Sequence, residues 1–152
     1  MRDVPERGPV LVIGYGNALR RDDGIGPWVA RELAALGLPQ VRVRSVHQLV
    51  PELAAELAEA RLAVFIDARV EPGRKPVTLE KLVPSAAAAV FAHGGDPGAV
   101  LSLAAVYGRV PPAVLVGVAG QDFRLGDGLS DFAAANARQA LRLVRDLVQS
   151  AD

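Results

Sequence analysis

The sequence predicts an α/β fold, a three-layer α/β/α sandwich around a twisted, mostly parallel, five-stranded sheet. Three continuous apolar runs, at residues 9–16, 61–68 and 113–120, are short, rich in Val and bounded by turn residues. Strands buried on both faces of a parallel sheet have this pattern. Segments with helical periodicity alternate with these runs, which is typical of right-handed strand–helix–strand crossovers.

Two further strands are expected at the margins of the sheet. Residues 40–46, "QVRVRSV", alternate apolar with basic or polar side chains, which suits a strand near an edge. Residues 75–82, "KPVTLEKL", are expected at the periphery because Pro76 has no N–H for a sheet ladder.

The helices between the strands have recognisable ends. Pro27 is expected at the first helical position of one helix, and Gly37 follows its end. Asp96 is the predicted N-cap of another helix, with Pro97 behind it. The remaining helices are expected at residues 50–60 and 130–149.

Composition limits the classes of protein that the chain can belong to. At 152 residues, 51% of them hydrophobic, the chain is expected to form one domain over residues 1–152. Lys+Arg and Asp+Glu balance at 17 each, so no nucleic-acid partner is indicated. The absence of cysteine excludes disulfides, thiolate metal sites and a cysteine nucleophile. With no signal core and no apolar run of membrane-spanning length, we expect a cytoplasmic monomer.

The stretch "GYGNALRRDDGIGP", residues 14–27, has the look of a glycine-rich phosphate loop after a strand. Gly14 and Gly16 fit the dinucleotide fingerprint, but its third glycine is replaced by Leu19. No Gly-Lys-Ser/Thr follows, and the adjacent Asp22 and Asp23 would repel a phosphate. A nucleotide site is therefore disfavoured.

The loop residues have other expected roles. The two glycines are expected to allow a sharp exit from the strand and close backbone packing. Asn17 is expected to tie the loop together through its side chain. The two aspartates belong either to a solvated turn before a helix or to a site that holds a cation.

Other polar residues favour the cation site. Asp67 ends an otherwise apolar strand, "LAVFID", and His93 precedes the helix that begins near Pro97. Sites in open parallel sheets form outside the carboxyl ends of the strands. Asp23, Asp67 and His93 are therefore expected to converge, and two carboxylates with one imidazole suit nickel or zinc.

Two residues after the strand at 40–46 keep alternative roles. His47 is either a partner that supports a ligand or a polar cap. Gln48 either binds a peptide backbone or belongs to the entry of the next helix. No G-x-S-x-G motif is present, so a serine hydrolase is not supported.

These motifs resemble those of the hydrogenase maturation proteases, the endopeptidases of the nickel–iron hydrogenase system. "GYGNALRRDDGIG" resembles that family's signature G-x-G-N-x-x-x-x-D-[DE]-G-x-G, and the strand ending in "IDA" and the histidine before "LSLA" follow in the expected order. "HQLVPELA" and "YGRVPPAVLVGVAG" resemble a branch associated with soluble multisubunit hydrogenases. The resemblance covers about residues 9–148.

The resemblance implies an α/β fold and a specific reaction. Family members remove a C-terminal extension from the hydrogenase large-subunit precursor after nickel insertion. Carried over by motif, Asp23, Asp67 and His93 are the expected catalytic and nickel-contacting residues. The nickel is expected to come with the substrate rather than to be permanently bound.

Two mechanisms and two other functions stay open on the sequence. The metal either polarises the scissile carbonyl or activates a water, or it is only an anchor while one aspartate acts as general base. The alternatives to a nickel-dependent endopeptidase are a non-catalytic nickel-binding chaperone of the large subunit and a metal-dependent hydrolase of another small amide or peptide.

Overall fold

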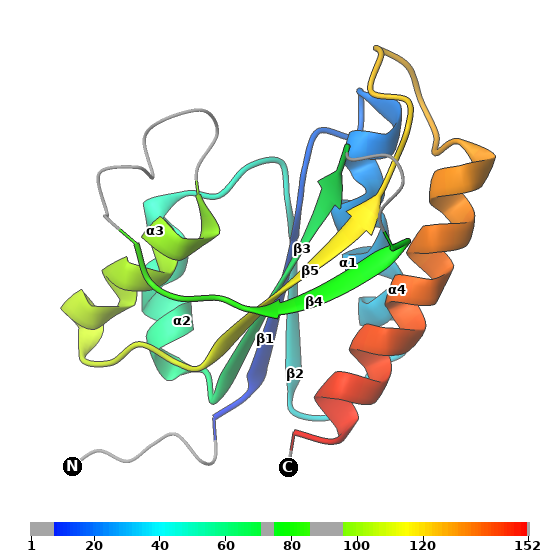
Figure 1. The fold of residues 1–152 in the computed structure, drawn as a ribbon. Coiled ribbons are helices and arrows are strands. Elements are labelled where there is room, and N and C mark those ends of the chain that lie inside the picture. Colours follow the sequence, from blue (N-terminus) through cyan, green and yellow to red (C-terminus); the bar gives the residue numbers. More distant parts are fainter. Residues whose placement is uncertain (1–7, 71–74, 86–95, 152) are drawn as a thin grey trace.

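The computed structural model describes residues 8–70, 75–85 and 96–151, and its centre is a five-stranded sheet. The strand order is β2-β1-β3-β5-β4. Four strands are parallel, and β4 runs antiparallel to β5 at one edge (Figure 1). The strands are β1 (Val10–Tyr15), β2 (Val41–Val46), β3 (Leu62–Arg69), β4 (Val77–Lys81) and β5 (Ala113–Ala119).

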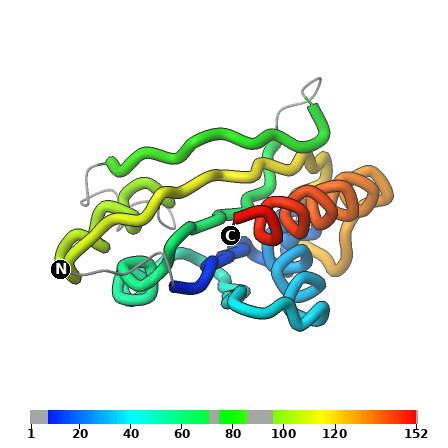
Figure 2. The backbone as a smooth tube through the Cα atoms, turned by 90° about the horizontal axis from the view of Figure 1, so that it is seen from below, coloured from blue at the N-terminus to red at the C-terminus, as the bar shows by residue number. Residues whose placement is uncertain are grey.

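Helices cover both faces of this sheet, which confirms the predicted sandwich. The helices α1 (Ile25–Ala35) and α4 (Asp131–Gln149) pack on one face. The helices α2 (Ala54–Glu59) and α3 (Pro97–Leu103) pack on the other (Figures 1 and 2). No helix among the described residues is long and apolar enough to cross a membrane.

The strands predicted at the margins lie at the two edges of the sheet. In β2, Arg42 and Arg44 are exposed, and the Arg44 Nε donates to Glu56 of α2 at 2.9 Å. Charged side chains on an edge strand discourage pairing with another chain. The other edge strand, β4, follows Pro76, as predicted.

Helix ends agree with the sequence at two positions and differ at a third. The side chains of Asp96 and Ser130 cap α3 and α4 by accepting from Gly98 N and Ala133 N. The prediction that Pro27 is the first helical residue is wrong, because α1 begins at Ile25. A 3₁₀ turn at Arg21–Gly24 leads directly into α1. Pro27 still lies in the first turn of the helix, where backbone N–H groups have no intrahelical acceptor, so its lack of an N–H costs no hydrogen bond.

Two glycines let the first turn of α1 approach the backbone of the sheet directly. A Cβ on Gly14 would lie 2.1 Å from the carbonyl oxygen of Gly26. A Cβ on Gly26 would lie 2.6 Å from the carbonyl oxygens of Tyr15 and Ile66. Only glycine fits at either position, so this pair fixes where α1 begins relative to β1 and β3.

We expect Gly14→Ala to lower the free energy of unfolding by about 3 kcal/mol or more, because backbone atoms on both sides must separate to admit the methyl group. Urea unfolding monitored by circular dichroism measures this loss. Gly24→Ala is the matched control, since its Cβ would lie no closer than 3.1 Å to a neighbouring atom. Equal losses for the two variants would contradict the proposed crowding at Gly14.

Candidate active site

The carboxyl ends of the parallel strands, those of β1 and β3 among them, lie together at one end of the sheet, the upper end in Figure 1. Gly14 pairs with Ile66 in the β1–β3 register, so the next residues, Tyr15 and Asp67, are neighbours. The N–H of Gly16 donates to Val46 O, which joins the exit of β1 to the end of β2. Candidate site residues are therefore grouped where α/β proteins form their sites.

Asp23 is held at this end of the sheet by the loop that precedes it. Its Oδ2 accepts a 2.7 Å hydrogen bond from the N–H of Asn17, and the Asn17 Oδ1 accepts from Leu19 N at 2.9 Å. Gly16 has φ +150°, and a Cβ there would lie 2.0 Å from Asp23 O. The loop therefore folds tightly around Asp23, whose side chain is half-buried.

Asp67 is partly buried, in an environment that disfavours its charge. Burial raises the pKa of the Asp67 carboxyl to about 6, the nearby Tyr15 hydroxyl opposes that rise, and the charge of Asp23 adds to it. The two carboxylates are therefore close enough to repel each other. A cation bound between them would relieve this repulsion, and carboxylate oxygens are suitable ligands for a divalent metal ion.

Asp22 has a different role from its neighbour, because its side chain is fully buried. Its Oδ2 accepts from the N–H groups of Gln121 and Asp122, both at 2.9 Å, and from the Ser130 hydroxyl at 2.7 Å. Its Oδ1 accepts from Ser130 N at 2.7 Å. Burial alone would raise the pKa of Asp22, but these hydrogen bonds outweigh it and hold the pKa below its usual value. The solvated-turn alternative is therefore wrong for Asp22.

The same contacts join the loop after β1 to the connection between β5 and α4. Arg21 N donates to Gly126 O, and Gly126 N donates to Leu19 O at 2.8 Å. The Arg21 guanidinium also forms an ion pair with Asp122 at 3.3 Å. Two segments about a hundred residues apart in the chain thus form one wall of the site, with Asp22 at its centre.

The other predicted residues are placed differently. His93 lies outside the described residues. His47 and Gln48 follow β2 and are exposed. Across residues 8–70, 75–85 and 96–151, no three histidine or carboxylate side chains gather closely enough to hold a metal ion. Asp23 and Asp67 are therefore the part of the predicted ligand set that the described residues supply.

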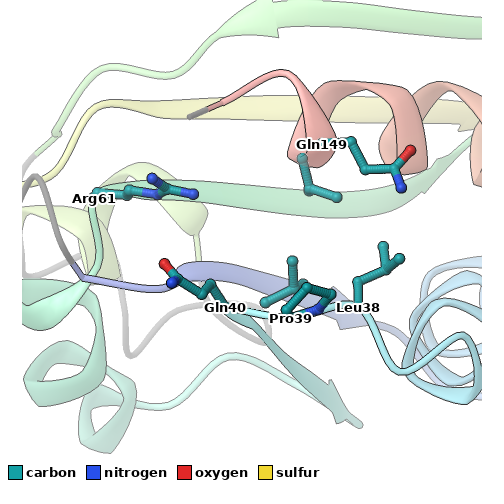
Figure 3. Close-up of a pocket in the computed structure, with 7 residues that line it drawn as sticks. Leu38, Pro39, Gln40, Arg61 and Gln149 are labelled. Carbon is teal, nitrogen blue, oxygen red and sulfur yellow. The ribbon is translucent and has the colours of Figure 1, made fainter.

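A pocket at the opposite end of the sheet, where the parallel strands begin, is separate from this site. It is lined by residues that include Leu38, Gln40, Arg61 and Gln149 (Figure 3). Gln40 and Arg61 immediately precede β2 and β3, so the pocket lies at the amino ends of the parallel strands. Sites in open α/β sheets form at the carboxyl ends, and neither Asp23 nor Asp67 lines this pocket.

Comparison with known proteins gives matches among solved structures. No protein-family model matches the chain, and a search of curated proteins gives no significant match. The maturation protease HycI from Thermococcus kodakarensis KOD1 is 23% identical, with a TM-score of 0.74 over 93% of each chain. HybD from Thermococcus kodakarensis is 25% identical, with a TM-score of 0.70 over 92% of this chain and 99% of its own. HybD from E. coli is 24% identical, with a TM-score of 0.71 over 93% of this chain and 92% of its own.

The sheet order and the acidic edge define the class: an α/β protein with paired carboxylates outside the carboxyl ends of its central strands. Within that class, the chain shares its fold with solved proteins named hydrogenase maturation proteases, the family that its motifs resemble.

We expect Asp22→Asn to lower the free energy of unfolding by about 2–4 kcal/mol, because an amide NH₂ would face several buried donors. The exposed carboxylate of Asp127, in the connection that Asp22 clamps, provides the matched control Asp127→Asn. Urea unfolding at pH 7 compares the two variants. Equal stability of Asp22→Asn and the wild type would contradict the clamp.

Asp67 makes the stability of the protein depend on pH. Because its pKa is raised to about 6 in the folded state, the unfolded chain loses this proton at lower pH, and stability falls as the pH rises from about 4 to 6. We therefore expect Asp67→Asn to stabilise the protein by about 2–3 kcal/mol at pH 8, with a much smaller gain near pH 4. Urea unfolding across this range measures the difference, and a gain independent of pH would contradict the raised pKa.

Proposed function

We propose that this chain is an endopeptidase that removes the C-terminal extension of a nickel–iron hydrogenase large-subunit precursor after nickel insertion. The observation that carries the proposal is that Asp23 lies near enough to Asp67 to raise its pKa, at the carboxyl end of a sheet in a fold shared with proteins named as hydrogenase maturation proteases. The signature around Asp22 and Asp23 supports the same function.

In this proposal, nickel arrives as part of the substrate, bound by the precursor's own ligands. Ionised Asp23 and Asp67, with His93, would complete its coordination and bring the scissile peptide to the crevice. This explains why the protein needs no thiolate of its own, and the chain has no cysteine. Precursor without nickel would lack the anchor and dock poorly, so metal insertion would precede cleavage.

The environment of Asp67 also suits a second role for the same residue. A carboxylate whose pKa is raised to about 6 is a better proton acceptor near neutral pH than an exposed aspartate. Asp67 could therefore take the proton of the attacking water, while Asp23, fixed by Asn17, contributes mainly to binding.

The test uses the cognate large-subunit precursor, purified with and without nickel, and mass spectrometry of the products. We expect the protein to release a C-terminal peptide from the nickel-loaded precursor only. Asp67→Asn should slow cleavage by at least about a hundredfold, because it removes both the charge and the proton acceptor. Asp127→Asn should cleave at the wild-type rate.

Two other outcomes would reject the proposal in different ways. An uncut precursor held in a stable complex would indicate a nickel-binding chaperone. Cleavage of both precursors at equal rates would show that nickel is not recognised, and normal cleavage by Asp67→Asn would show that the site residues are wrongly assigned.

A further inference from the structure

One buried polar group beside the site is not explained by the proposed function. Tyr15, the last residue of β1, is only 8% exposed, and its Oη has no hydrogen-bond partner in good geometry among the described residues, although it lies near enough to the Asp67 carboxyl to lower the pKa of that group. A buried hydroxyl without a partner destabilises a fold by about 1–3 kcal/mol, so such a group calls for a reason. Phenylalanine would fill the same space without this penalty, yet the residue at position 15 is tyrosine.

The sheet register places this hydroxyl beside a candidate catalytic residue. Gly14 pairs with Ile66, so Tyr15 and Asp67 occupy neighbouring positions on adjacent parallel strands. Side chains alternate between faces along a strand, and Tyr15 shares the α2–α3 face with Phe65. Asp67 is two residues beyond Phe65 and therefore belongs to that same face.

The other acceptor near Tyr15 is already engaged. Asp96, the N-cap of α3, accepts from the Ser85 hydroxyl at 2.7 Å through Oδ2 and from Gly98 N at 3.3 Å through Oδ1. Burial, and then the negative charge of Asp67, raise the pKa of the Tyr15 phenol above its usual value. With Asp96 engaged, the Asp67 carboxylate is the acceptor left for the Tyr15 hydroxyl.

We propose that Tyr15 is a positioning residue whose buried hydroxyl donates a hydrogen bond to Asp67 and holds that carboxylate in its reactive orientation. This inference rests on the proposed function, since it assigns Tyr15 a role in the same site. The Tyr15 hydroxyl is shielded from solvent, so it acts through Asp67 and not by touching the substrate. A bond to one oxygen leaves the second carboxylate oxygen free for the reaction.

The substitution Tyr15→Phe removes only the hydroxyl and preserves the buried ring. We expect the rate of cleavage of nickel-loaded precursor at saturating enzyme to fall about 10- to 100-fold, the range for residues that orient a ligating or catalytic group. The enzyme concentration that gives half of this rate should change much less than the rate itself, because Tyr15→Phe leaves the charge of Asp67 in place. The thermal midpoint should fall slightly at pH 8, because the ionised Asp67 loses a hydrogen bond.

The chain has one other tyrosine, Tyr107, which is 60% exposed, and Tyr107→Phe is the matched control. It should leave the cleavage rate unchanged. A merely structural Tyr15 would show a lower thermal midpoint with the cleavage rate preserved, and this result would overturn the inference. A normal rate with a normal midpoint would overturn it as well.

A second measurement does not depend on catalysis. The thermal midpoints of Tyr15→Phe, Asp67→Asn and the double variant are compared at pH 8, where Asp67 is ionised. Non-additive shifts support the contact, because the two side chains then influence each other directly. Additive shifts overturn it. If wild-type protein cuts no precursor, the proposed function fails, while this comparison still decides whether Tyr15 acts on Asp67.

Discussion

The contact between the backbones of β1 and α1 at Gly14 and Gly26 is the constraint on which the site depends. Because no side chain separates them, α1 begins directly against the ends of β1 and β3. The 3₁₀ turn that carries Asp22 and Asp23 is continuous with this helix, so its position is fixed too. The spacing between the glycines of the motif therefore sets the distance of the carboxylates from the sheet.

Adjacent aspartates in this turn have opposite physical tasks. Asp22 is buried, and its full set of backbone and hydroxyl donors stabilises its charge. Asp23 accepts one backbone hydrogen bond and lies near Asp67, where a second negative charge is unfavourable. Asp22 thus holds the two segments of the site together, whereas the charge of Asp23 is only partly compensated by hydrogen bonding.

The sequence predicted the parts of the fold that local patterns encode. Continuous apolar runs identified β1, β3 and β5, alternation identified the edge strand β2, and the capping residue Asp96 identified the start of α3. The role of Asp22 could not be predicted, because its partners lie 99 to 108 residues away and carry no motif. The role of Tyr15 could not be predicted either, since it depends on the register of β1 with β3. The convergence of His93 with the aspartates stays a prediction.

The long separation between Asp22 and Ser130 has a consequence for how the protein is made. The four donors that stabilise the charge of Asp22 belong to residues 121–130, the connection from β5 to the N-cap of α4. In a chain still emerging from the ribosome, water must solvate this carboxylate until those residues appear. The wall of the site around Asp22 therefore takes its final shape late in synthesis, after β1, β3 and their crossover helices can already have formed.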